Sequence, residues 1–128
     1  MIVSDFKIFK YRTFHRWAKK EKIPDSTLKN AVDEINAGLF EANLGGHLYK
    51  KRIVKPGKGK RGGYRMLIAF KNNTRAFFIY GFAKNEQSNI TEKELEAHKR
   101  VAQFYLDASE MVIEKLLTEK NIIEITDV

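Results

Sequence analysis

The chain has 128 residues, which fits one domain, and its hydrophobic content of 43% argues against disorder. It has no cysteine, which excludes disulfide bonds and zinc-thiolate sites, and no apolar run near the roughly 20 residues of a membrane span. Its net charge is +8, which favours polyanionic partners. The N-terminus lacks a signal-peptide pattern. We therefore expect one cytoplasmic domain over residues 1–128, with a C-terminal arm from about residue 119.

The first third of the chain predicts one strand and two helices. Lys7 to Phe14 favours a strand, and helical spacing of the apolar residues then predicts a short helix to about Lys22. A second amphipathic helix is expected to begin at an N-cap at Asp25 or Ser26 and to end at Gly38 as its C-cap. The apolar residues of both helices are predicted to be core.

The middle of the chain predicts three strands joined by turns. Leu39 to Gly46 has no strand pattern and is expected to be a connection. Strands are predicted over Leu48 to Val54, Tyr64 to Phe70 and Ala76 to Phe82. The last two are nearly continuous apolar runs, which are typical of central strands covered on both faces.

The last third predicts two helices and a short tail. Thr91 and Glu94 form a capping-box pattern at the start of the first helix. The second covers Ser109 to about Leu117, and the tail from Asn121 is a short strand or an ordered arm. The order β-α-α-β-β-β-α-α predicts an α+β fold, with helices on one side of a small, mostly antiparallel sheet.

Residues 42–85 are strongly basic. This stretch contains no Asp or Glu and holds eleven basic residues: Lys50, Lys51, Arg52, Lys55, Lys58, Lys60, Arg61, Arg65, Lys71, Arg75 and Lys84. Such a block makes a local positive field that suits a polyanion. The alternative is a solvated loop, but the block coincides with the predicted sheet.

Common catalytic patterns are not found in the sequence. The histidines His15, His47 and His98 are scattered without ligand spacing, so we expect surface or capping roles for them and no bound metal. The glycine-rich segment of residues 57–63 lacks the Gly-Lys-Ser/Thr ending of a nucleotide-binding loop, and a strand rather than a helix follows it. No cofactor is therefore predicted.

Basic residues on the strands are the remaining candidates for a site. Lys50 and Arg52 are two apart and share one face of their strand, while Lys51 points to the other. Arg65 is expected to face solvent at the start of the next strand, the alternative being a pair with a carboxylate. With Lys84 at the end of the third strand, these residues predict a concave positive patch.

Two tyrosines, Tyr64 and Tyr80, are expected beside this patch, where a ring can stack on an RNA base. The patch itself can hold a phosphodiester. If it also cleaves RNA, arginines can stabilise the phosphorane charge, and clustered lysines can move protons. The residue types alone indicate binding rather than catalysis.

Three segments together carry a family resemblance: Lys50-Lys-Arg52, Gly57-Lys-Gly-Lys-Arg-Gly-Gly-Tyr-Arg65 and Gly81-Phe-Ala-Lys-Asn-Glu86. In this order and spacing they resemble the HigB-type branch of the RelE/ParE toxin superfamily, over about Phe6 to Ala108. The resemblance implies a RelE-like fold and the toxin of a type II toxin–antitoxin system. It further implies a ribosome-dependent messenger RNA endoribonuclease that cleaves by 2′-OH attack without a metal and is inhibited by a cognate antitoxin.

The resemblance also implies site residues. The catalytic positions it implies are Lys50, Arg52, Arg65 and Lys84, with Arg65 steadying transition-state charge. The RNA-contacting positions, from the resemblance and the basic block together, are Lys51, Lys58, Lys60, Arg61, Tyr64, Tyr80 and Asn85. The chain departs from RelE itself at Asn85, where RelE has an arginine, and near Thr91, where it has a catalytic tyrosine. The general base or acid is therefore open among Lys84, Arg61 and Tyr80.

Two other functions fit the same scaffold. One is a ParE-like inhibitor of DNA gyrase, and the other is a nucleic-acid-binding module without catalysis. The basic cluster favours the ribonuclease, because a gyrase inhibitor needs no phosphate-cleaving face.

Overall fold

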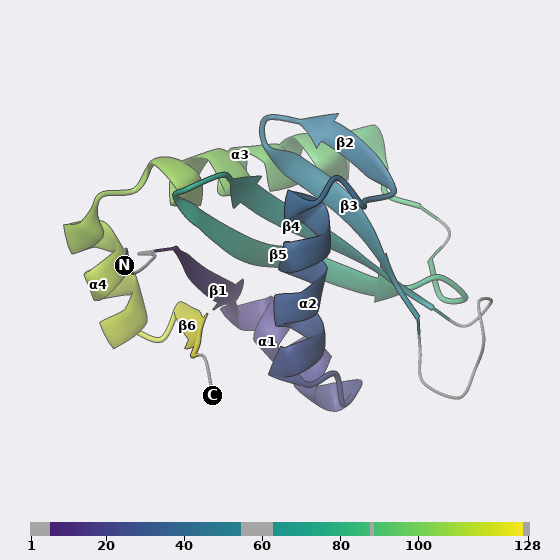
Figure 1. Ribbon diagram of the computed structural model, residues 1–128, viewed down its shortest axis with the longest axis horizontal. Coiled ribbons are helices and arrows are strands. Elements are labelled where there is room, and N and C mark those ends of the chain that lie inside the picture. Colours follow the sequence, from purple (N-terminus) through teal and green to yellow (C-terminus); the bar gives the residue numbers. More distant parts are fainter. Residues whose placement is uncertain (1–5, 55–62, 88, 127–128) are drawn as a thin grey trace.

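A computed structural model describes residues 6–54, 63–87 and 89–126, in which four helices pack on a six-stranded sheet of order β2-β3-β4-β5-β1-β6 (Figure 1). The strands are β1 Lys7–Tyr11, β2 Ala42–Gly45, β3 Leu48–Ile53, β4 Tyr64–Lys71, β5 Arg75–Ala83 and β6 Ile122–Ile125. The helices are α1 Arg12–Lys20, α2 Asp25–Asn36, α3 Glu92–Asp107 and α4 Glu110–Thr118. Strands β1 and β5 are parallel, and the other neighbours are antiparallel, which confirms the α+β class.

The helices cover both faces of the sheet, so the expectation of helices on one side is wrong. Helices α1 and α2 pack on one face, and α3 and α4 pack on the other. Figure 1 shows α2 in front of the sheet and α3 behind it. The cause lies in β4 and β5, which carry apolar side chains on both faces and are buried along nearly their whole length, as predicted for central strands.

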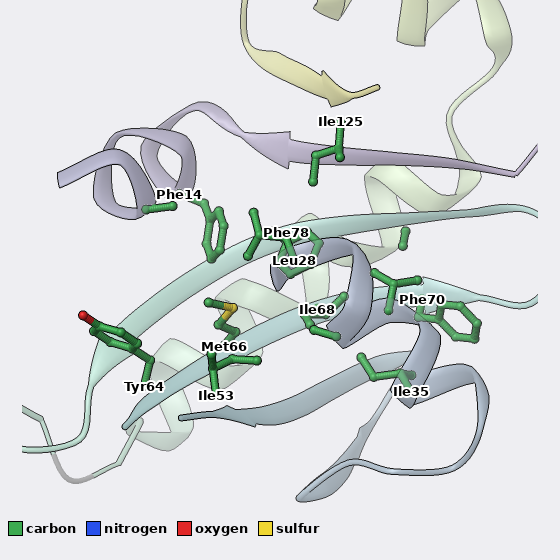
Figure 2. Close-up of a cluster of buried hydrophobic side chains, with 14 of the residues drawn as sticks. Phe14, Leu28, Ile35, Ile53, Tyr64, Met66, Ile68, Phe70, Phe78 and Ile125 are labelled. Atoms are coloured by element: carbon green, nitrogen blue, oxygen red, sulfur yellow. The ribbon is translucent and has the colours of Figure 1, made fainter. Parts of the chain in front are cut away.

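The core on the α1/α2 side runs along alternate residues of the central strands. Met66 and Ile68 of β4 contact this core together with Phe78 of β5, and Leu28 covers them from α2 (Figure 2). Tyr64 lies at one end of the cluster, with its hydroxyl pointing away from the other labelled side chains (Figure 2). Burial of these side chains is the main stabilising contribution of this face.

The core on the α3/α4 side is built around stacked rings. Phe77 of β5 stacks on Phe9 of β1 and on Tyr105 of α3, with centroids 4.9 Å apart in both pairs. Ala102 and Leu106 of α3 are buried in the same core. The ring stack fixes where α3 crosses the sheet. It therefore also fixes which strand residues lie beside the N-terminal half of the helix.

The predicted capping box at the start of α3 is present, whereas the predicted caps of α2 are shifted. The Thr91 side chain accepts a hydrogen bond from the Glu94 N–H, and the Glu94 carboxylate accepts one from the Thr91 N–H, which confirms the capping box. Ser109 caps α4. The expected N-cap of α2 is wrong, because Pro24 is its N-cap and Asp25 lies in the first turn, where it pairs with Lys10 at 2.8 Å. Ala37 is the C-cap of α2, and Gly38 follows it with a positive φ.

Two elements differ from the predictions, and the C-terminal tail takes one of its two predicted forms. Strand β1 ends at Tyr11, because α1 already begins at the next residue. The expected connection before Gly46 contains β2, which pairs with β3 through a tight turn where Gly46 and His47 have positive φ. The C-terminal tail is a strand, β6, at the edge of the sheet. Over the described ranges, the helices are too short or too polar to span a membrane.

Candidate functional site

Two rows of residues cross β3, β4 and β5 on the α3 side of the sheet. In the first row, Arg52 lies opposite Arg65, which lies opposite Phe82. In the second, Lys50 lies opposite Leu67, which lies opposite Tyr80. Leu48 and Leu67 belong to the α3/α4-side core, and strand alternation puts Lys50, Arg52 and Arg65 on that same face. We call these three residues the basic face.

Glu41 joins two members of the basic face. The Arg65 Nε donates to both carboxylate oxygens of Glu41, at 3.0 and 3.1 Å, and Lys50 Nζ lies 3.6 Å from the same carboxylate. Arg65 is only 8% exposed, so the expectation that it faces solvent is wrong and the carboxylate-pair alternative is what occurs. The reason is that Glu41, just outside the acid-free stretch, is held beside β3 by its N–H bond to the Lys50 carbonyl.

Arg52 is the most solvent-accessible member of the basic face. It sits one residue before the buried Ile53 at the end of β3, directly opposite Arg65. Two guanidinium groups at opposed positions raise the local positive potential, and Glu41 offsets only part of it. This end of the sheet is therefore suited to bind a phosphodiester.

Lys51 and Tyr64 lie on the opposite side of the sheet. Lys51 points to the α1/α2 side, as predicted, and its ammonium pairs with Glu34 of α2 at 2.9 Å. Tyr64 is 2% exposed in the α1/α2-side core, and its hydroxyl donates to Glu21 at 2.9 Å. The expectation that Tyr64 lies beside the basic residues is therefore wrong, because its ring is buried in the core on the other face. Burial, followed by the bond to Glu21, raises the pKa of Tyr64 to about 12.

Tyr80 stands beside the basic face, as expected, and is half-buried. Its hydroxyl donates to the Gln87 side-chain oxygen at 2.9 Å, and the Gln87 amide donates to the Asn89 carbonyl. Its ring stacks on His98 of α3, with centroids 4.8 Å apart and an interplanar angle of 25°. Two neighbours thus fix the ring, one through the hydroxyl and one through the face.

His98 is a functional candidate that the sequence reasoning did not select. Burial lowers the pKa of His98, and the nearby Glu94 carboxylate opposes this only in part. The imidazole is therefore mostly neutral near pH 7 and can accept a proton. A signal was present, because His98 lies three residues after Leu95 and four before Ala102, on the stripe that packs against the sheet.

The remaining predicted residues lie at the end of β5 or outside the described residues. Lys84 and Asn85 are exposed in the turn after β5, and the Lys84 N–H donates to the Gly63 carbonyl at 3.1 Å. This bond ties that turn to the start of β4 and so to the basic face. Lys58, Lys60 and Arg61 are outside the described residues.

The geometry combines a surface of three basic side chains, a fixed aromatic ring and a histidine whose pKa is lowered by burial. These are the parts needed to bind an RNA strand and to move a proton beside it. Within the described ranges, no group of three or more His, Cys, Asp or Glu side chains is placed to hold a metal ion.

A family model for the RelE toxin of RelE/RelB toxin–antitoxin systems matches residues 6–125. The chain belongs to the RelE toxin family. The match spans every described element, including the basic face and His98. The predicted RelE/ParE superfamily is thereby confirmed, and membership implies a cognate antitoxin as the partner of this RelE-family toxin. No curated protein sequence matches the chain.

Proposed function

We propose that this RelE-family toxin is a ribosome-dependent messenger RNA endoribonuclease that works in the cytoplasm by 2′-OH attack without a metal. The observation that carries the proposal is the basic face beside a fixed Tyr80–His98 pair. Three cationic side chains and a neutral imidazole lie at one end of the sheet, on the face where the sequence expects the site. The described residues of the three segments that resemble the HigB-type branch include Arg52, Arg65 and Lys84, and the resemblance supports assigning the chain to that branch.

In the proposed mechanism, the RNA backbone lies on the basic face. Neutral His98 accepts the proton of the 2′-OH as its oxygen attacks the adjacent phosphorus. Arg52 and Arg65 stabilise the negative charge that develops on the phosphorane oxygens. The Lys50 ammonium gives a proton to the departing 5′-oxygen, so the products are a 2′,3′-cyclic phosphate and a 5′-hydroxyl.

Other residues serve this site without taking part in proton transfer. Glu41 holds the Arg65 guanidinium in place through its Nε. Lys84, exposed at the end of β5, adds a further phosphate contact. Tyr80 positions His98 by stacking.

Dependence on the ribosome follows because the described part of the site offers no strong general base. Among the described residues, the base assigned to this site is a half-buried histidine, so the rate depends on a substrate whose 2′-OH is already in line with the scissile phosphate. The ribosomal A site can impose that alignment on a message. Free RNA is expected to bind through its phosphates, with little sequence preference and a steep loss of affinity as salt rises.

The test compares cleavage of one message free in solution and in a stalled ribosome complex, with the ends of the products identified. We expect strong cleavage only in the complex, leaving 2′,3′-cyclic phosphate or 3′-phosphate ends. Equal rates would indicate a free ribonuclease, and 3′-hydroxyl ends would contradict the metal-free mechanism. Cleavage in neither sample, together with inhibition of DNA supercoiling by gyrase, would favour the ParE-like alternative.

A further inference from the structure

The second half of β5 is paired with a strand on one side only within the described residues. Strand β1 pairs with β5 only from Arg75 to Phe78, because β1 ends where α1 begins. From Ile79 onward, β4 is the only strand that pairs with β5 within the described residues. Helix α1 covers the other edge instead, and Trp17 packs so closely on Gly81 that a Cβ there would lie 2.2 Å from the indole ring.

A cavity of about 400 Å³ lies along this edge. Its walls combine side chains of α1, of β5 and of the turn that follows, among them Thr13, Trp17, Tyr80, Phe82, Glu86 and Gln87. The volume falls within the roughly 300–1,000 Å³ of small-molecule sites. Three of these six side chains are aromatic, so the cavity offers flat apolar walls to a flat ligand.

We infer that this cavity binds one unpaired base of an RNA strand whose phosphates lie on the basic face. The inference rests on the proposed function and extends it to base recognition. Phe82, in the cavity wall, is opposite Arg65 in the strand register, and Arg65 is opposite Arg52. Arg52 and Phe82 are thus two strand spacings apart, about 10 Å, within reach of a nucleotide's own base and phosphate.

The cavity and the basic face carry opposite charges, so they favour different parts of a nucleotide. The cavity wall includes the Glu86 carboxylate, which repels phosphate but accepts hydrogen bonds from the amino and imino groups of a base. The basic face has the opposite preference. An RNA strand therefore binds most favourably when its backbone lies over β3 and β4 and one base enters the cavity at the β5 edge.

The wall residues are fixed before any ligand binds. Gln87 accepts a hydrogen bond from the Tyr80 hydroxyl, and His98 stacks on one face of the same ring. Trp17 is held by ring contacts to Phe14 and Tyr64, with centroids 5.5 and 5.3 Å away. A rigid aromatic wall loses little conformational entropy on stacking, which is the property of a base-binding platform.

Trp17 is the only tryptophan of the chain, so its fluorescence reports on this cavity directly. The probe is a pentamer of 2′-O-methyl RNA, which cannot be cleaved, compared with a pentamer of the same backbone that carries no bases. We expect the pentamer with bases to quench Trp17 and to bind about tenfold more tightly than the abasic one, the effect of one stacked base.

A matched pair of variants tests the cavity itself. Thr13 is exposed in the first turn of α1 and lines the cavity, so Thr13→Phe fills the space without removing a core side chain. Thr118→Phe makes the same change at an exposed position of α4. With both proteins folded by thermal melting, Thr13→Phe should reduce the difference between the pentamers to less than twofold, and Thr118→Phe should keep it.

The outcomes separate this inference from the proposed function. Equal, salt-dependent binding of both pentamers with unchanged Trp17 emission would overturn the cavity assignment and leave the basic face intact. Binding of neither pentamer would overturn both. Quenching by the antitoxin but by neither pentamer would assign the cavity to the protein partner and overturn the inference.

Discussion

The two faces of the sheet treat the same basic stretch of chain in opposite ways. On the α1/α2 side, Lys51 is paired with Glu34 and Tyr64 is buried against Glu21. On the α3/α4 side, the neighbours Arg52 and Arg65 belong to the basic face, next to Tyr80. Residues adjacent in sequence therefore have different roles, because each strand sends alternate side chains to opposite faces.

The difference comes from where the helices cross. Helix α2 packs along β3 and its Glu34 pairs with Lys51, whereas α3 packs over β4 and β5 and stacks His98 on Tyr80. A charge count over residues 42–85 shows neither arrangement. The functional surface is a property of one face, and substitutions on the two faces should separate activity from stability.

The largest expected effect is on catalysis, from His98→Gln. The amide keeps the size of the side chain but cannot act as a base near neutral pH, so cleavage in a ribosome complex should fall about 100-fold. Since burial lowers the pKa of His98, the wild-type rate should stay high at pH 6.5 and fall only at lower pH, as the imidazole becomes protonated. Rates of the two proteins across pH 5–8 measure both effects.

A His98→Gln profile that keeps the wild-type fall at low pH would contradict this role. Glu94→Gln offers a control, because Glu94 raises the pKa of His98 and the variant should shift the fall to still lower pH. The same side chain caps α3, so the stability of the variant is measured in parallel.

Arg65→Ala is expected to affect stability and activity together. It removes a nearly buried guanidinium and leaves the Glu41 carboxylate without its main partner. The free energy of unfolding measured in urea should therefore fall by about 2 kcal/mol relative to the wild type. Arg65→Lys, which keeps the charge, should lose less stability but remain poorly active, because it lacks the guanidinium fork. An unchanged urea midpoint for Arg65→Ala would contradict a stabilising contribution from the Arg65–Glu41 pair.

The fold was largely predictable because its signals are local. Continuous apolar runs marked β4 and β5, and the pattern of Thr91 and Glu94 marked the start of α3. Strand β2 escaped because its sequence Ala-Asn-Leu-Gly is only four residues long and contains no β-branched or aromatic residue, and pairing with β3 makes it a strand. The same apolar runs indicated central strands covered on both faces, but the predicted arrangement placed the helices on one side of the sheet.

The site was less predictable because its partners are distant in sequence. Alternation correctly separated Lys51 from Lys50 and Arg52. It did not show that Glu41, 24 positions before Arg65, folds back onto that arginine. The stacking of His98 on Tyr80 likewise depends on how α3 crosses the sheet, which no local pattern encodes.

A smaller effect is expected from Tyr64→Phe on the α1/α2 side. Loss of the hydroxyl that donates to Glu21 should cost about 1 kcal/mol of stability near neutral pH, with cleavage unchanged. Because the folded-state pKa of Tyr64 is raised to about 12, the neutral phenol contributes stability that is lost as pH rises from 10 to 12. Part of that decline should disappear in the variant, and the rest reflects Tyr105, whose pKa burial also raises.

The most direct test of the account uses adjacent residues on opposite faces. Arg52→Gln and Lys51→Gln each remove one positive charge from β3, one on the basic face and one beside Glu34. Single-turnover cleavage of a message in a stalled ribosome complex is measured for both. The account predicts a loss of about 100-fold for Arg52→Gln and less than about threefold for Lys51→Gln. Equal losses, or a larger loss for Lys51→Gln, would contradict a functional surface on the α3 side of the sheet.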